Sequence, residues 1–273
     1  MLINLNGNII EDKLTLSINN RAFKYGDGLF ETLKIIGGKL VFAEDHYFRL
    51  MASMRMLRMH IAMDLTLDFF ENEILKTVTE NGLSDARVRF SVFRKDGGLY
   101  LPENNAIDFL IEVSQLSIPL KKEYTIDLFK DHYVYSGLLS TLKTNNKILN
   151  VVASIYAEEN GFDNCILLNE KKQLVEAINS NIFLVKDKKI TTPALSEGCV
   201  KGVVRKNLIA MLSKNKDLEI EEIEISPFEL QKADEVFLTN AIVGIQAVNN
   251  YRKKTFTTEI SDYLKKELDK VTG

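Results

Sequence analysis

Cysteine and histidine are scarce in this chain of 273 residues, which contains two cysteines and three histidines. Cys165 and Cys199 are too few and too far apart to indicate a disulfide framework, and free cysteine behaves as a small hydrophobic residue. The sequence also lacks CxxC and HxxxH patterns, the kind of spacing that zinc sites use. We therefore expect two reduced, structural cysteines and no metal site.

Long hydrophobic runs and an excess of one charge are missing too. No window approaches the roughly 20 apolar residues of a membrane span, and the opening MLINLNGNIIEDKL has no basic segment followed by an apolar one. With 35 basic and 38 acidic residues, the net charge is -3, which favours neither nucleic acid nor an anionic membrane as a partner. These absences predict a globular cytoplasmic protein.

The periodicity of the first part of the chain predicts an α+β layer. LINLNGNII alternates like a strand, LFETLKIIGGKLVFAEDH is typical of a hairpin around Gly37 and Gly38, and ARVRFSVFR and AIDFLIEVSQL are two further strands. The spacing of apolar residues predicts helices over residues 45–59 and 67–81.

The chain changes character around SIPLKKEYTI, where Pro119 marks a candidate linker. We therefore expect two domains, residues 1–117 and 118–273. The second contains the segment TIDLFKDHYVY, a helix that carries the lysines of LKTNNK, the short strands CILLN, QLVEA, NIFLVKD and KITTP, a helix over residues 202–214, and the segment EVFLTNAIVGIQAVNN. Closely spaced short strands with few helices are typical of a partly closed barrel.

Three segments offer groups that could bind a charged ligand. SEGCVKGVVRKNLIAML places Gly202 directly before a helix, and backbone N–H groups at a helix start bind phosphate. Arg49 lies in the first predicted helix, where its guanidinium can fork onto a phosphate or carboxylate. Glu176 ends the strand QLVEA, and a buried carboxylate needs a cationic or protonated partner. Each also has a structural interpretation: a loop glycine, a snorkelling arginine and an internal ion pair.

Two lysines add a possible nucleophile, although lysine is overwhelmingly a surface residue. Lys143 and Lys147 lie in LSTLKTNNKILNVVASIYAEENG, at the mouth of the predicted helix. An amine, a carboxylate that can hold a pyridinium proton, an arginine and a phosphate-binding helix start together match the functional groups of pyridoxal phosphate. Composition alone leaves open whether these groups converge.

Seven motifs in order resemble the class IV aminotransferase family, the fold-type IV pyridoxal phosphate enzymes: NRAFKYGDGLFETLK, EDHYFRL, VFRKDGGLY, LKTNNKILNVVA, VEAINSNIFLV, GCVKGVVR and VFLTNAIVGI. They cover nearly the whole chain at the family's usual spacings. The resemblance implies a pyridoxal 5'-phosphate-dependent lyase or transaminase that works as a homodimer. It also implies a small N-terminal α/β domain and a larger, barrel-like C-terminal α/β domain, with the cofactor between them.

The resemblance assigns roles to particular residues. Lys143 is implied to form the Schiff base and then to act as general acid and base, for which a desolvated, neutral amine is suited. Glu176 is implied to hold the proton on the pyridine nitrogen, and Lys147 is then an ordinary lysine. The other implied cofactor-binding residues are Arg49, Asn181, Gly202, Val203, Val204 and Thr239. The candidate substrate-binding residues are Phe30, Lys34, Tyr100 and Asn240.

Short motifs distinguish three members of this family. Branched-chain aminotransferases carry a glycine-rich, tyrosine-containing stretch after the lysine, which KTNNKI lacks, and D-amino acid aminotransferases carry an arginine and a histidine that RKDGGLYLP lacks. LTNAIVGIQAV and GGLYLP resemble aminodeoxychorismate lyases, although no arginine stands in GGLY. The resemblance therefore favours a lyase that forms 4-aminobenzoate and pyruvate. An amino acid aminotransferase is the alternative, and a non-catalytic relative that binds the cofactor is a third.

Overall fold

The chain forms two compact units. The computed structural model describes residues 1–13, 16–118 and 121–272, so the candidate linker residue Pro119 lies outside the described residues. Unit 1 contains residues 1–118 and the short segment Lys143–Asn146, and unit 2 contains residues 119–142 and 147–273. Among the described residues, no helix is both long and apolar enough to cross a membrane.

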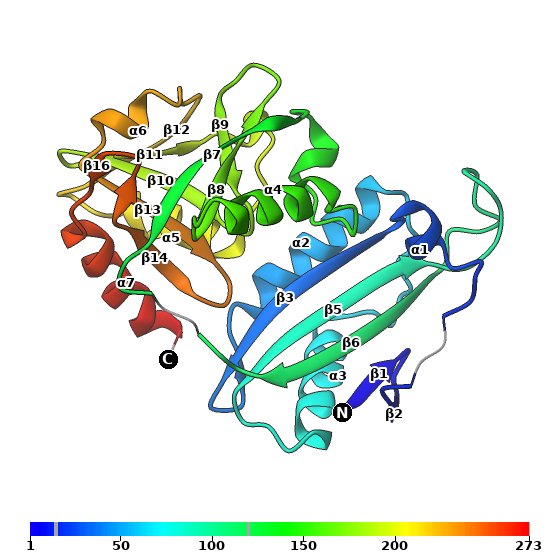
Figure 1. Cartoon of the computed structure of the whole chain (residues 1–273). Helices are drawn as coiled ribbons and strands as arrows, with labels where there is room; N and C mark the ends of the chain where they lie inside the picture. Colours follow the sequence, from blue (N-terminus) through cyan, green and yellow to red (C-terminus); the bar gives the residue numbers. More distant parts are fainter. Residues whose placement is uncertain (14–15, 119–120, 273) are drawn as a thin grey trace. The chain divides into compact units, whose positions relative to one another are not determined.

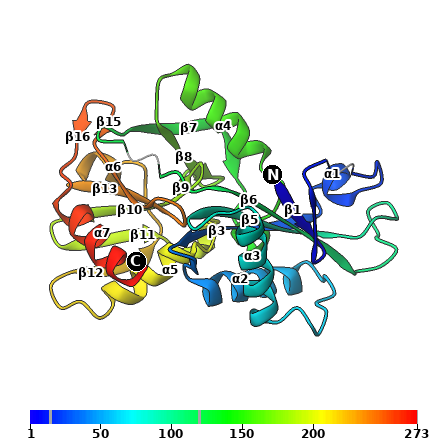
Figure 2. The same cartoon turned by 90° about the horizontal axis from the view of Figure 1, so that it is seen from below.

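Unit 1 is a six-stranded antiparallel sheet with two helices on one face (Figure 1, Figure 2). The strand order is β2-β1-β6-β5-β3-β4. Leu33, Phe70 and Phe90 are fully buried between the sheet and helices α2 and α3. The elements are β1 (Leu2–Leu5), β2 (Asn8–Glu11), α1 (Arg21–Tyr25), β3 (Gly28–Ile36), β4 (Lys39–Leu40), α2 (Ala43–Met56), α3 (Leu67–Glu80), β5 (Ala86–Arg94) and β6 (Ile107–Gln115).

Local sequence signals explain the elements of unit 1. Gly37 and Gly38 have φ values of 54° and 76°, which a two-residue hairpin turn requires and glycine supplies. The Thr66 hydroxyl caps α3 by accepting a hydrogen bond from the Phe69 N–H. The predicted hairpin, both predicted helices and the two long strands are confirmed apart from their end residues.

Unit 2 contains two five-stranded sheets, ordered β12-β11-β10-β13-β14 and β16-β15-β7-β8-β9. Helix α4 packs on β7 and β8, whereas α5 and α7 pack on the first sheet. A core that includes Ile126, Ile166, Ile182 and Val236 draws on both sheets. The strands are β7 (Thr125–Val134), β8 (Asn164–Asn169), β9 (Leu174–Ala177), β10 (Asn181–Lys186), β11 (Lys189–Pro193), β12 (Glu219–Ile223), β13 (Glu235–Asn240), β14 (Gly244–Val248), β15 (Asn250–Tyr251) and β16 (Lys254–Thr255). The helices are α4 (Ile148–Glu159), α5 (Val203–Leu212), α6 (Glu229–Lys232) and α7 (Glu259–Thr272).

One prediction about the second half of the chain is wrong. The lysine-bearing helix begins at Ile148, so Lys143 and Lys147 both precede it. The segment Lys143–Asn146 instead pairs with β3, where Leu29 and Thr144 form an antiparallel bridge. A backbone engaged in such a bridge is extended, which excludes a helix at Lys143.

Candidate active site

Lys143 lies on the short segment that pairs with the start of β3. The Phe30 N–H donates to the Lys143 carbonyl over 3.0 Å, and the Asn145 N–H donates to the Gly28 carbonyl over 2.9 Å. A Cβ at Gly28 would lie 2.6 Å from the Asn145 side chain, so glycine permits this close approach. The Lys143 Nζ lies 4.5 Å from the centre of the Phe30 ring, within the range of a cation–π contact.

Three further cations share the sheet face that carries Phe30. Lys34 stands opposite Arg87 across the β3–β5 ladder, and Arg89 stands opposite Thr32, two positions along, so these side chains project from one face. The Arg89 guanidinium lies 3.7 Å from the Phe30 ring centre. Burial lowers the pKa of Arg89, against the opposing effect of Glu112. The sequence did not identify Arg89, because only the strand register shows that it neighbours Phe30.

Arg49 contacts a buried acid on the helix-covered side of the same sheet. Its Nε donates to Oε1 of Glu31 over 2.8 Å, and its Nη2 donates to Oε2 of the same carboxylate. The Nδ1 of His46 lies 2.7 Å from that Oε2. Burial alone would raise the pKa of Glu31, but Arg49 and His46 outweigh it and lower that pKa to about 2. The arginine is therefore held as one member of a buried charged cluster.

In unit 2, the start of α5 is shaped as an anion site. Val203 and Val204 open the helix after Gly202, and the first N–H groups of an α-helix have no intrahelical acceptor. A Cβ at Gly202 would lie 2.0 Å from Oδ1 of Asn181, so only glycine permits this approach. The Asn181 side chain in turn donates to the Val200 carbonyl over 2.9 Å. A helix start with this geometry and dipole suits a phosphate.

Thr239 and Glu176 border the same loop. Thr239 stands opposite Asn181 in the β10–β13 ladder, and its buried hydroxyl has no hydrogen-bond partner within the described parts of the chain. A buried hydroxyl without a partner is costly, so an external acceptor such as a phosphate oxygen fits it. Oε2 of Glu176 accepts a hydrogen bond from the Val200 N–H over 2.8 Å. Unit 2 thus brings Glu176, Asn181, Gly202 and Thr239 together around one loop.

Lys147 differs from the ordinary surface lysine that the sequence indicated. It is the N-cap residue of α4 and is partly buried. Burial lowers the pKa of its amine, and the negative charge of Glu176 opposes that shift. Lys147 is therefore close enough to Glu176 for their charges to interact, and it is the matched control for Lys143.

Two predicted substrate residues have other contacts. Tyr100 is 89% exposed in the loop between β5 and β6, and its ring lies 5.5 Å from that of Tyr25. The Asn240 side chain donates to the Ser180 hydroxyl and accepts from the N–H groups of Ile242 and Val243. These bonds make Asn240 part of the turn between β13 and β14, with a structural role that does not depend on a substrate.

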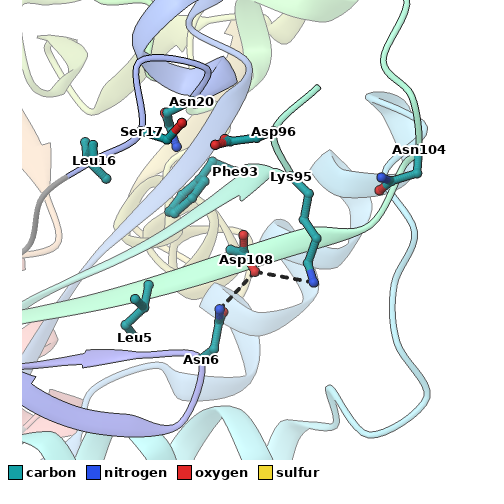
Figure 3. Close-up of a pocket in the computed structure, with 10 residues that line it drawn as sticks. All are labelled: Leu5, Asn6, Leu16, Ser17, Asn20, Phe93, Lys95, Asp96, Asn104 and Asp108. Carbon is teal, nitrogen blue, oxygen red and sulfur yellow. Dashed lines mark hydrogen bonds and ion pairs between the residues drawn. The ribbon is translucent and has the colours of Figure 1, made fainter. Parts of the chain in front are cut away.

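A cavity of about 410 Å³ lies elsewhere in unit 1 (Figure 3). At this cavity Lys95 forms an ion pair with Asp108 at 3.8 Å, and the Asn6 side chain donates to the same carboxylate. The residues that line it are Leu5, Asn6, Leu16, Ser17, Asn20, Phe93, Lys95, Asp96, Asn104 and Asp108. None of the predicted site residues is among them, so this cavity is separate from the candidate chemistry.

The cysteines are also separate from it. Cys165 and Cys199 are buried and free, and burial raises their pKa values to about 11 and about 12. Thiols in this state are poor nucleophiles. Within the described residues, no cluster of three or more histidine, cysteine or acidic side chains could hold a metal.

Comparisons with known proteins bear on the identity of this site. Residues 28–251 match the family model of class IV aminotransferases. A Methanocaldococcus jannaschii protein assigned as a branched-chain-amino-acid aminotransferase is 28% identical, over 97% of this chain and 96% of that protein. The aminodeoxychorismate lyase of Vibrio harveyi is 26% identical, over 85% of this chain and 86% of that protein.

A solved structure has the same fold. The branched-chain aminotransferase of Thermoproteus uzoniensis matches with a TM-score of 0.90 and 20% identity, over 100% of this chain and 95% of that chain. This likeness confirms the predicted α+β, fold-type IV architecture. Together with the family match over most of its length, it shows that the chain belongs to the class IV aminotransferases, a family of pyridoxal phosphate-dependent transaminases and lyases.

Proposed function

We propose that this chain is an aminodeoxychorismate lyase-like enzyme that binds pyridoxal 5'-phosphate. Lys143 is the amine that joins the cofactor's aldehyde carbon, and Glu176 is the carboxylate for its ring nitrogen. The phosphate is bound by Arg49 and by the loop and helix start that contain Asn181, Gly202, Val203, Val204 and Thr239. The unpartnered Thr239 hydroxyl and the glycine-dependent approach at Gly202 support this assignment.

In this proposal, the cationic sheet face of unit 1 determines which substrate is bound. Lys34, Arg87 and Arg89 project from the face that bears Phe30, and Lys143 lies over the same ring. Glu112, 3.9 Å from Arg89, is the acid that partly offsets them. A cluster of cations favours a substrate with more than one carboxylate, and aminodeoxychorismate has two. Lys34 and Arg89 are the proposed carboxylate-binding residues, with Phe30 as the apolar floor and Tyr100 and Asn240 as further candidates.

The roles of these residues in the reaction follow from their chemistry. When bound, pyridoxal phosphate supplies an aldehyde that captures the substrate amine and a ring that withdraws electrons from it. Lys143 then removes a proton from the substrate ring with its Nζ, acting as a general base. The ring's C–O bond to the enolpyruvyl group then breaks as the ring becomes aromatic, which yields 4-aminobenzoate. The released enolpyruvate takes up a proton to become pyruvate. Glu176 keeps a proton at the pyridine nitrogen throughout, and the cations of unit 1 hold the carboxylates in place.

An amino acid aminotransferase is the second candidate. The branched-chain relative matches at 28% identity over 97% of this chain, a longer match than that of the lyase. The same Lys143 amine would then deliver its proton to the cofactor's aldehyde carbon instead of taking one from a substrate ring. Glutamate, the common amino donor for transaminases, also has two carboxylates and would use the same cations.

The two candidates are separated by their products. The purified protein, loaded with pyridoxal phosphate, is given aminodeoxychorismate in one reaction and L-glutamate, L-leucine or D-alanine in others. We expect 4-aminobenzoate and pyruvate in equal amounts from the first reaction. Conversion of an amino acid to its keto acid, with no aromatic product from aminodeoxychorismate, would contradict the lyase proposal and support the second candidate.

The assembly and location of the protein are part of the proposal. We infer a homodimer, in line with the family resemblance. The exposed apolar side chains Leu99, Tyr100 and Leu101 on the β5–β6 loop support it, because such patches mark interaction surfaces. Light scattering that gives the mass of one chain would contradict this. A cytoplasmic location fits the two free cysteines.

A further inference from the structure

The loop between β11 and α5 contains a buried acid that has no part in the proposed cofactor contacts. Glu197 is 4% exposed and ends the short helical turn Leu195–Glu197. Its Oε2 accepts a hydrogen bond from the Asn169 side chain over 2.9 Å, and its Oε1 accepts from the Ser196 hydroxyl over 3.1 Å. Both donors are neutral, so these contacts do not offset the cost of burying a charge as an ion pair would. The acid therefore needs an explanation beyond stability.

Asn169 connects this loop to the hairpin that carries Glu176. Asn169 ends β8 and is fully buried, and its Nδ2 donates to both the carboxylate and the carbonyl of Glu197. Its Oδ1 accepts from the N–H groups of Lys171 and Gln173, in the turn that leads to β9. Glu176 lies on β9. One amide side chain thus joins the β8–β9 hairpin to the β11–α5 loop.

The same two segments meet again further along the loop. The Val200 N–H donates to Oε2 of Glu176 over 2.8 Å, and the Val200 carbonyl accepts from the Asn181 side chain over 2.9 Å. The Val200 peptide is therefore bound on both of its sides, by an acid on β9 and by an amide on β10. The Asn169–Glu197 contact holds the loop before this peptide, and Asn181 holds it from the other side.

We propose that Glu197 and Asn169 are positioning residues that fix the β11–α5 loop so that the Val200 N–H orients the Glu176 carboxylate. This rests on the proposed function, in which Glu176 faces the ring nitrogen of the cofactor. A backbone N–H sets the plane of a carboxylate only when the backbone itself is fixed, and the Asn169–Glu197 contact fixes it. A preorganised carboxylate stabilises a protonated ring nitrogen better than a mobile one, because it does not need to reorient.

Glu235 provides a matched control in the same unit. It is 3% exposed, and its carboxylate oxygens accept from the N–H groups of Ile260 and Ser261 at the start of α7, over 2.8 and 2.9 Å. Like Glu197, it is a buried acid whose hydrogen bonds come from neutral donors. Its contacts support a helix start instead of the β11–α5 loop. Replacing it should therefore lower stability without changing the ring nitrogen of the cofactor.

The test follows the protonation of the cofactor's ring nitrogen by nitrogen NMR, with isotope-labelled pyridoxal phosphate bound to the whole chain. Circular dichroism and urea unfolding report folding and stability. We expect Glu197→Ala to shift the signal toward the neutral ring nitrogen and to lower kcat about 10-fold. Glu197→Gln should keep most of the wild-type signal, because its amide oxygen still accepts from Asn169. Glu235→Ala should lose stability and keep the wild-type signal.

A further variant and a double-mutant cycle separate positioning from folding. Glu197→Asp keeps the charge but shortens the side chain, so it should give a smaller shift in the same direction, and it carries the test if Glu197→Ala does not fold. In a Glu176→Gln background, Glu197→Ala should cause no further shift, because the carboxylate that it orients is gone.

Two kinds of result would count against these assignments. A wild-type signal in the folded Glu197 variants, or an equal shift in Glu235→Ala, would overturn the positioning role. A signal that Glu176→Gln leaves unchanged would instead show that the proposed role of Glu176 is wrong, and the inference would fail with it.

Discussion

The two units of the molecule contribute different kinds of groups to the candidate chemistry. In the proposed function, unit 1 supplies ions: the amine of Lys143, the guanidinium groups of Arg49 and Arg89, and the amine of Lys34. Unit 2 supplies mainly neutral, fixed donors, namely the first N–H groups of α5 and the Thr239 hydroxyl, together with the one carboxylate of Glu176. Charged side chains act over distance and are screened by salt, whereas backbone donors act through fixed geometry. Substitutions in the two units should therefore reduce binding or turnover in different ways.

The largest effect is expected at Lys143. Replacing Lys143 with alanine removes the proposed nucleophile and proton carrier, so turnover should fall at least ~1,000-fold. Lys147→Ala is the matched control, four residues away and in unit 2, and it should retain most of the turnover. If Lys147→Ala abolishes turnover and Lys143→Ala does not, the two lysines have been assigned the wrong way round.

The next largest effect is expected at the carboxylate of unit 2. Glu176→Gln cannot hold a proton on the ring nitrogen as an anion does, so kcat should fall roughly 100-fold while the cofactor remains bound. Glu170→Gln is the control in the same unit, since Glu170 is exposed and its carboxylate accepts from the N–H and the hydroxyl of Ser136. Steady-state kinetics with saturating cofactor measure both. A Glu176→Gln enzyme with full kcat would show that the reaction does not need the Glu176 carboxylate.

The charged cluster of unit 1 should make stability depend on pH in acid. The pKa of Glu31 is lowered from 4.5 to about 2 in the folded state, so the folded state binds this proton less readily than the unfolded state does. Its stabilisation is complete above pH 4.5 and is lost as the pH falls toward 2, by on the order of 3 kcal/mol. Urea unfolding of the wild-type protein and Glu31→Gln between these pH values should show the wild type losing more stability. If the wild type and Glu31→Gln lose the same amount of stability as the pH falls, the pKa of Glu31 is not lowered by folding.

The smallest effect is expected at the neutral donors of unit 2. Thr239→Val keeps the shape of the side chain but removes a hydroxyl that has no partner in the described chain. It should weaken pyridoxal phosphate binding about 10-fold with little loss of stability. Thr192→Val is the control, because its hydroxyl donates to the Ile182 carbonyl over 2.8 Å. That variant should lose about 1 kcal/mol of stability and bind the cofactor normally, and the reverse pattern would contradict the assignment.

The difference between the units also explains how far the sequence could predict the structure. Helix α3 and the hairpin at Gly37 and Gly38 follow from local signals, so their prediction succeeded. Strand β12, with sequence EIEEI, was missed because three of its five residues are acidic and it forms the edge of a sheet. Helix α7 was missed although Leu264 and Leu268, spaced one turn apart, are buried, and that spacing could have identified it.

The site shows a similar division. The motif GCVKGVVR pointed to the start of α5 because a glycine before an amphipathic helix is visible in one segment. The partners of Arg49 and the position of Arg89 beside Phe30 depend on strand register and on contacts between distant segments. Lys143 was placed on a helix because residues 148–159 carry a strong helical pattern, while its pairing with β3 involves residues more than a hundred positions earlier. No local pattern encodes such a contact.

The most direct test of the account is the covalent attachment site of the cofactor. The wild-type protein is incubated with pyridoxal phosphate, reduced with borohydride, digested and mapped by mass spectrometry. We expect a single modified residue, Lys143, whose modification is absent from Lys143→Ala and unchanged in Lys147→Ala. Modification at Lys147, or no stable adduct at either lysine, would contradict it.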